Sequence, residues 1–270
     1  MSVRGPARGC MALSSTSSPN VLAVRTVGAD RPWMWLQAGW RDLRHTPTVS
    51  LAYGTAFVGI SFVLTLGLWL LDLLYLLLPL AAGFMFLGPI LAMGLYDVSR
   101  QLEHDEIPTL AHALGAWRDR GGSIATMGLI LVLFQLAWIR IAFLLFALFF
   151  GLEPPSWDSL INIVFFTTQG VPFLLAGTAI GGILAALVFT ITAVAIPILL
   201  ERDVGTMAAI TTSVAAVQVN WRVMIGWGAL IVVFTAAGLV TFYIGLAVTL
   251  PLLGYATWHA YRDLVEPPGR

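Results

Sequence analysis

Long apolar runs, separated by short polar segments, dominate the order of residues along the chain. A helix needs about 20 mostly apolar residues to cross the hydrocarbon core of a bilayer, which is about 30 Å thick. Five runs reach that length, and the last is long enough for two crossings with a turn near residues 238–241. The pattern therefore predicts an all-α membrane protein with six transmembrane helices. The five runs are residues 51–71, 73–96, 124–150, 171–200 and 223–258.

A second pattern precedes the first, third and fifth apolar runs. From Trp33 to Leu43, apolar side chains recur at i, i+3, i+7 and i+10, which is the spacing of a helix with one apolar face. The same stripe recurs over residues 107–117 and 207–221, and each stripe carries a Trp-Arg pair near its end. Tryptophan favours the headgroup boundary, and arginine can extend its charge to lipid phosphate. The predicted interfacial anchors are Trp40, Arg41, Trp117, Arg118, Trp221 and Arg222.

Three similar units follow from these two patterns. Each unit would consist of a cytoplasmic interfacial helix and a transmembrane hairpin, and each returning run contains a proline followed by Ile-Leu or Leu-Leu. The distance between the tryptophan and the proline differs from unit to unit, which counts against a strict repeat. An alternative therefore stays open, because tryptophan and arginine also mark the cytoplasmic borders of inner-membrane proteins that have no internal repeat.

Arginine placement gives the orientation, because basic residues stay on the cytoplasmic side of the inner membrane. With six crossings and both termini inside, every arginine except Arg140 would lie in a cytoplasmic segment. The opposite side would keep the acidic residues Asp72, Glu153 and Asp158. We therefore expect a multi-pass protein of the bacterial inner membrane whose N- and C-termini are both cytoplasmic.

Composition supports the membrane assignment and removes one class of partner. Of the 270 residues, 59% are hydrophobic and 10% are charged, whereas soluble domains are about 45–50% apolar and about 25% charged. The formal net charge is zero, so membrane lipids and not nucleic acid are the expected contacts. Cys10 is the only cysteine, which excludes an intramolecular disulfide. The expected organisation is a disordered polar leader over residues 1–32, a six-span helical membrane domain over 33–265 and a short tail over 266–270.

Arg140 is the one arginine away from the predicted cytoplasmic segments, and two explanations stay open. A charge near the middle of a bilayer costs about 2.5–3.5 kcal/mol on insertion scales and usually marks function or an ion pair. If the third helix spans residues 124–150, Arg140 lies inside it and could pair with Asp72 or another acidic residue of the outer side. If the span begins near Gly121, it can end by Ile139, and Arg140 is then an anchor at the outer interface, which is the interpretation that we favour.

Residues 103–112, EHDEIPTLAH, form the one cluster of metal-binding residue types in the sequence. Their spacing matches no standard metal site, and a solvated turn that leads into a helix explains them well. The motifs predict no catalytic residue, metal site or cofactor, so we expect that the protein is not an enzyme. The GxxxG of Gly177 and Gly181 predicts close helix packing, and a broken helix beside a substrate site is the alternative.

Three separated blocks of the sequence resemble one bacterial family. They are LPLAAGFMFLGPILAMGLYDVSRQLE at 78–103, IPILLERDVGTMAAITTS at 196–213 and LPLLGYATWHAYRDLV at 250–265. The family is catalogued as domain of unknown function 2189, uncharacterised integral membrane proteins, and the likeness covers about residues 33–265. It implies a multi-span inner-membrane protein and no particular activity. Some members are labelled cytochrome c oxidase subunit I, but that chemistry needs more histidines within spans than the four that this chain has in all.

Two functions from different classes remain. The absence of a catalytic motif beside marked interfacial helices favours an accessory or structural membrane component. Such a component would act through membrane lipids or a membrane-protein partner, for example a respiratory-oxidase complex. The alternative is a small-molecule transporter or channel, which is favoured by the hairpin pattern, the prolines of the returning runs and Arg140.

Overall fold

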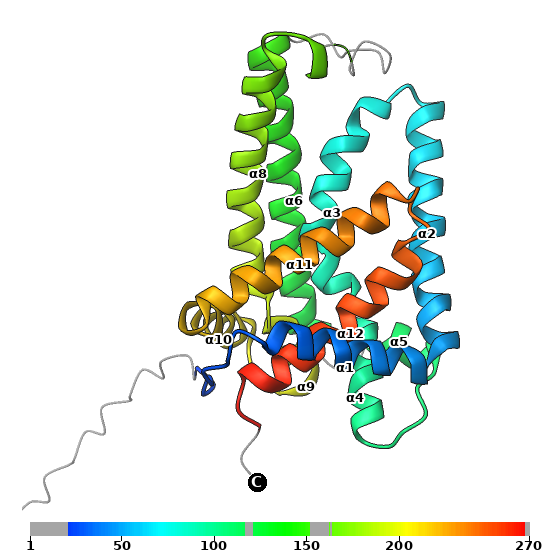
Figure 1. Ribbon diagram of the computed structural model, residues 1–270, viewed down its shortest axis with the longest axis vertical. Helices are drawn as coiled ribbons and strands as arrows, with labels where there is room; N and C mark the ends of the chain where they lie inside the picture. Colours follow the sequence, from blue (N-terminus) through cyan, green and yellow to red (C-terminus); the bar gives the residue numbers. More distant parts are fainter. Residues whose placement is uncertain (1–20, 117–120, 152–161, 163, 268–270) are drawn as a thin grey trace, which may run out of the picture.

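The computed structural model describes residues 21–116, 121–151, 162 and 164–267. Within these residues the chain folds into helices, with one isolated antiparallel bridge between Val24 and Val265. The long apolar helices stand side by side in a bundle, and shorter helices gather at one of its ends (Figure 1). The all-α fold that the apolar runs predict is confirmed.

Five segments of the described chain are long and apolar enough to cross a membrane. Three of them are single helices: α2 (Pro47–Leu70), α6 (Gly121–Phe150) and α11 (Trp221–Val240). The segment Leu74–Glu103 consists of η1 (Leu74–Leu76), α3 (Leu77–Leu91) and α4 (Met93–Glu103). The segment Gly170–Glu201 consists of α8 (Gly170–Thr192) and α9 (Ala195–Glu201). In α2 and α6 only 17% of the most apolar stretch is buried within the protein. Most side chains of these two helices therefore face outward, as lipid-facing helices do.

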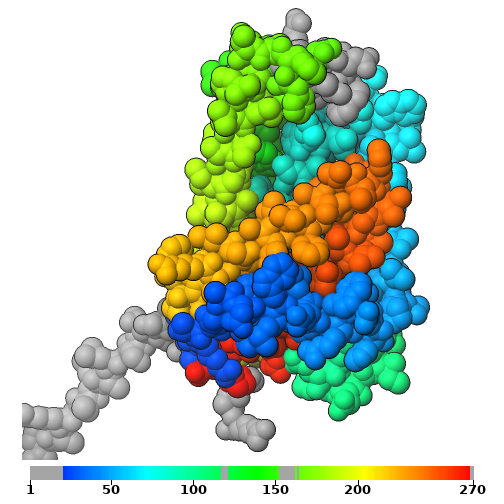
Figure 2. All heavy atoms as spheres, in the orientation of Figure 1, coloured from blue at the N-terminus to red at the C-terminus, as the bar shows by residue number. Residues whose placement is uncertain are grey.

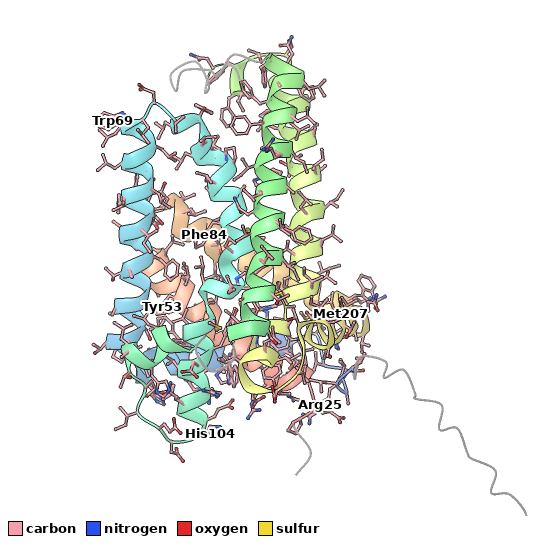
Figure 3. All side chains as sticks on the ribbon, turned by 180° about the vertical axis from the view of Figure 1, so that it is seen from behind. Arg25, Tyr53, Trp69, Phe84, His104 and Met207 are labelled. Carbon is pink, nitrogen blue, oxygen red and sulfur yellow. The ribbon has the colours of Figure 1, made fainter. Side chains whose placement is uncertain are left out.

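We call the end of the bundle where α4 and α9 finish the polar end. α1 (Arg31–His45) lies across it, and α5 (Leu110–Gly115) and α10 (Thr206–Val219) also lie there (Figures 1 and 3). The bundle's other end, which we call the far end, carries Trp69 (Figure 3). α1, α5 and α10 form in the three segments where the sequence predicts interfacial helices, although Trp117 and Arg118 lie outside the described residues.

α12 (Leu246–Leu264) is the central element of the polar end. It contacts α1, α2, α4 and α11, and its aromatic side chains Tyr255, Trp258 and Tyr261 are fully buried. The sequence predicts a sixth transmembrane span here, because the apolar run 223–258 is long enough for two crossings. The structure shows instead that other helices of the same chain surround it.

Two glycines explain how α12 comes so close to its neighbours. A Cβ atom on Gly54 of α2 would lie 2.2 Å from the carbonyl oxygen of Ala247, and one on Gly39 of α1 would lie 2.7 Å from the backbone nitrogen of Ala256. Both distances are shorter than any real carbon contact, so only glycine fits there. As a result α2 packs mainly against α12 rather than against α3, and the predicted hairpin arrangement is not confirmed.

The predicted sixth crossing is also not confirmed. α12 is not among the five candidate segments, and α11 and α12 run obliquely across the face of the bundle seen in Figures 1 and 2. The turn between them covers residues 241–245 and overlaps the predicted position, 238–241, at Thr241. The hydroxyls of Tyr243 and Thr65 lie 3.0 Å apart, so the turn stands beside α2 more than one helical turn before that helix ends.

Candidate functional site

A cluster of charged side chains joins three helices at the polar end. The guanidinium of Arg262 on α12 lies 2.7 Å from Glu201 of α9 and 2.9 Å from Glu103 of α4. The indole nitrogen of Trp258 donates a hydrogen bond of 3.1 Å to Glu103. Each carboxylate comes from a different block of the family resemblance, and Arg262 from the third. The blocks that look alike in sequence therefore meet in space.

Tyr261 extends this cluster to a second arginine. Its hydroxyl donates to Glu201 and accepts a hydrogen bond of 2.9 Å from Nε of Arg202, whose guanidinium also lies over the tyrosine ring. Burial, together with the neighbouring Glu201, raises the pKa of Tyr261, so the phenol keeps its proton and stays a donor. The arrangement joins α9 and α12 through paired donors and acceptors, in which Glu201 accepts from Tyr261 and Arg262.

Asp42 of the predicted interfacial segment has a partner on two other helices. Its carboxylate accepts a hydrogen bond of 2.6 Å from Ser99 on α4 and lies 2.8 Å from Nε2 of His259 on α12. The sequence pattern explains Trp40 and Arg41 but not this aspartate. The structure shows that Asp42 fixes α1 to the bundle.

Asp263 makes a second connection between α1 and α12. Arg31 donates two hydrogen bonds to its carboxylate, at 2.6 and 2.5 Å, and Trp35 donates a third at 3.0 Å. Burial opposes ionisation of this carboxyl group, but the three donors outweigh burial, so the pKa of Asp263 lies below its usual value. The carboxylate is therefore held in its charged form.

The predicted interfacial anchors that the structure describes are exposed at the polar end. The exposed fraction is 41% for Trp40 and 52% for Trp221, and Arg41 and Arg222 are exposed as well. The guanidinium of Arg222 lies 5.1 Å from the centre of the Trp221 ring. This placement suits contact with lipid headgroups, but their role as anchors stays a prediction.

The structure does not bring Arg140 and Asp72 together. Arg140 is exposed on α6, and Asp72 is exposed in the turn after α2, where its φ is +57°. No ion pair joins the two among the described residues, and the other suggested partners, Glu153 and Asp158, lie outside those residues. Both explanations of Arg140 remain predictions.

The segment 103–112 contributes to the charged cluster through its first residue, Glu103. In the described part of the chain, no three side chains of His, Cys, Asp or Glu come together as metal ligands do. Thr109 caps α5 by accepting a hydrogen bond from the backbone nitrogen of His112. The segment is thus a capped turn in which one residue reaches the cluster.

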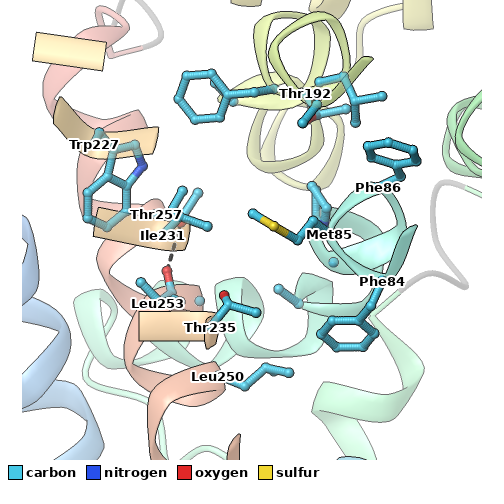
Figure 4. Close-up of a pocket in the computed structure, with 18 of the residues that line it drawn as sticks. Phe84, Met85, Phe86, Thr192, Trp227, Ile231, Thr235, Leu250, Leu253 and Thr257 are labelled. Atoms are coloured by element: carbon cyan, nitrogen blue, oxygen red, sulfur yellow. Dashed lines mark hydrogen bonds between the residues drawn. The ribbon is translucent and has the colours of Figure 1, made fainter. Parts of the chain in front are cut away.

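An apolar cavity of about 130 Å³ lies between α3, α8, α11 and α12 (Figure 4). Aromatic and aliphatic side chains make up most of its wall, among them Phe84, Phe189 and Trp227, and no charged residue lines it. A single water needs only about 10–15 Å³ in such a measure. The cavity is therefore large enough for part of an organic molecule. Sequence reasoning missed it, because its wall comes from helices that are distant in the chain.

Comparison with known proteins adds one finding. A family model described as predicted integral membrane protein, domain of unknown function 2189, matches residues 77–201. No match was found among curated proteins or among solved structures. The matched range contains Glu103 and Glu201 of the charged cluster but not Arg262. Together with the five apolar segments, the match shows an integral membrane protein that resembles the family catalogued as domain of unknown function 2189.

Proposed function

We propose that the protein is a non-catalytic accessory or structural component of the bacterial inner membrane that acts through lipid or protein partners. The observation that carries this proposal is the contrast between the polar end and the long helix faces. At the polar end, charged side chains such as Arg262, Glu103 and Glu201 join helices to one another. The faces of α2 and α6 instead expose apolar side chains, with Val63 70% and Leu144 69% exposed. Lipid or another membrane protein has to cover such faces.

The polar end would lie on the cytoplasmic side, with both termini there. Supporting this orientation, described arginines such as Arg31, Arg202 and Arg262 take part in contacts at the polar end. Basic residues concentrate on the cytoplasmic side of inner-membrane proteins. In this orientation α1 and α10 would lie along the cytoplasmic leaflet, with Trp40 and Trp221 at its headgroups.

Isolation from native membranes in polymer-bounded lipid discs is expected to recover a stoichiometric partner, either a membrane protein or an enriched lipid. Intact-complex mass spectrometry and lipid analysis of the discs would identify it.

A matched pair of variants tests the apolar faces. Leu144→Ser places a hydroxyl at an exposed apolar site on α6. The control, Thr126→Ser, changes an exposed site on the same helix that already carries a hydroxyl. Loss of the partner in the first variant only would support the proposal. Discs that hold the protein alone, with lipids in bulk proportions, would contradict it.

The α11–α12 turn is expected to lie within the hydrocarbon, so that this hairpin enters the membrane without crossing it fully. Three residues at the turn are strongly exposed and apolar: Val240 at 80%, Phe242 at 79% and Ile244 at 65%. The turn also bonds its own backbone, since the amide of Ile244 donates to Thr241 and that of Leu246 to Tyr243. Backbone at membrane depth must be satisfied in this way. The other four candidate segments would then make four full crossings, and an even number of crossings leaves both termini on one side.

Cysteine labelling measures the depth of this turn. In a Cys10→Ser background, Phe242→Cys is expected to resist a membrane-impermeant maleimide added to the outer side, whereas Asp72→Cys is expected to react. The comparison is internal, because both sites are exposed turns that follow an apolar helix. Equal labelling of the two sites would instead show six full crossings.

A further inference from the structure

Among the described residues, buried side chains that carry a hydroxyl make hydrogen bonds within the protein except at the cavity. In a helix, a threonine commonly donates to the carbonyl four residues earlier. Thr192 does so with Val188 and Thr257 with Leu253, each at 2.7 Å, and Figure 4 shows the second of these bonds. These two threonines line the cavity but keep their hydroxyls bonded to their own helices.

Thr235 and Thr249 line the same cavity and make no such bond. The Oγ1 atom of Thr249 is buried and has no partner, and Thr235, which is only 9% exposed, has no hydrogen bond among the described residues. Figure 4 shows the hydroxyl of Thr235 directed into the space opposite Phe84 and Met85. Both side chains have turned away from the acceptor that their helix offers.

Tyr96 on α4 is a third exception at this cavity. Three other tyrosines are buried and each has a partner: Tyr53 donates to the carbonyl of Leu91, Tyr255 pairs with Ser50, and Tyr261 donates to Glu201. Tyr96 is only 3% exposed and lines the cavity, and no hydrogen bond of its hydroxyl exists within the described chain. Buried hydroxyls normally find a partner, so the two unpaired hydroxyls of Tyr96 and Thr235 at one cavity point to a ligand. The Oγ1 atom of Thr249 is instead shielded from the cavity and lies against Gly238 of α11.

We propose that the cavity binds a neutral, membrane-soluble molecule whose carbonyl oxygens accept hydrogen bonds from Tyr96 and Thr235. The ligand is neutral because no charged residue lines the cavity. It carries acceptors because each of these two hydroxyls has a proton that no protein acceptor takes. It is largely apolar because aromatic and aliphatic side chains form the rest of the wall. A volume of about 130 Å³ holds one ring or one ester group, with the remainder of the molecule between the helices.

Two membrane molecules share this chemistry, and binding measurements separate them. A quinone offers ring carbonyls, and a diacylglycerol offers ester carbonyls. We would titrate decylubiquinone and dioleoylglycerol separately into the delipidated full-length protein and follow binding by intact mass spectrometry. One equivalent of either molecule supports the inference and identifies the source. Binding of neither molecule overturns it, because the cavity then holds water or nothing.

Matched variants test whether the unpaired hydroxyls make the contacts. Thr235→Val and Tyr96→Phe are each expected to weaken binding about 5- to 10-fold, as loss of one hydrogen bond does. Thr257→Val and Thr192→Val alter the same cavity by the same change of atoms and are expected to weaken binding less than about twofold, because those hydroxyls are already bonded within the helix. Equal effects in the two sets would overturn the inference.

The inference stands apart from the proposed accessory role. The binding measurement uses the purified chain alone, whereas the proposed function is tested by what the chain brings with it from native membranes. A stoichiometric protein partner, together with a cavity that binds neither probe, would leave the accessory role standing and overturn the inference.

Discussion

Replacing Arg262 by methionine is expected to lower the free energy of unfolding by about 3 kcal/mol, the low end of the range for breaking a buried ion pair. The substitution leaves the carboxylates of Glu103 and Glu201 beside each other without the cation that lies between them. We choose the low end because the side chain of Arg262 is still 30% exposed, and water screens part of the charge. Unfolding by denaturant in detergent micelles, followed by tryptophan fluorescence, measures the change.

Two further variants show whether charge is the cause. Adding Glu103→Gln and Glu201→Gln to Arg262→Met is expected to recover at least about 1 kcal/mol, because the unpaired negative charges are removed. Arg44→Met changes an arginine that lies over the ring of Trp40 at the exposed surface, and it is expected to cost less than about 1 kcal/mol. If Arg262→Met cost no more than Arg44→Met, the cluster would not be what joins α4, α9 and α12.

Two glycines of α2 are expected to respond to alanine in opposite directions. Gly54→Ala should destabilise the protein by about 2–3 kcal/mol, the upper part of the range for overpacking. The new Cβ would lie 2.2 Å from the backbone carbonyl of Ala247, so α2 and α12 have to move apart. Gly59→Ala should stabilise by about 0.5–1 kcal/mol, because alanine is the better helix former. Nothing lies within 4 Å of that position.

The same unfolding measurement compares the two variants in one helix. Their difference does not depend on the hydrophobicity of alanine, since the two changes add the same methyl group. A similar loss in both variants would mean that helix propensity or lipid contact decides the outcome. It would also mean that α12 does not approach α2 as closely as the structure shows.

The sequence predicts where the helices lie along the chain better than it predicts which helices pack against each other. The length of an apolar run depends only on local sequence, and it predicts α2, α6 and α8 because bilayer thickness sets their length. The periodic apolar stripe is also a local pattern, and it predicts α1 and α10. Neither signal says which helix lies beside which. The close approach at Gly54 depends on Ala247, which is far away in sequence, and no local pattern reports it.

The candidate sites were harder to predict for a related reason. Glu201 and Arg262 stand in the blocks that resemble the family, yet alone each is an ordinary charge at a helix end. Only the fold brings them together with Glu103. Thr235 carries even less signal, because a threonine in an apolar helix normally bonds to its own backbone. Its importance depends on the direction of its side chain, which no local sequence pattern reports.

The central position of α12 also has a consequence for the order of events during synthesis. α1, α2 and α4 leave the ribosome long before the helix on which they pack, so their contacts with α12 cannot form until its segment has been made. The backbone of Arg25 then bonds to Leu264, which closes the ring of contacts between early and late parts of the chain. The packing of these early helices therefore depends on contacts that are distant in sequence, and such contacts are slow to form.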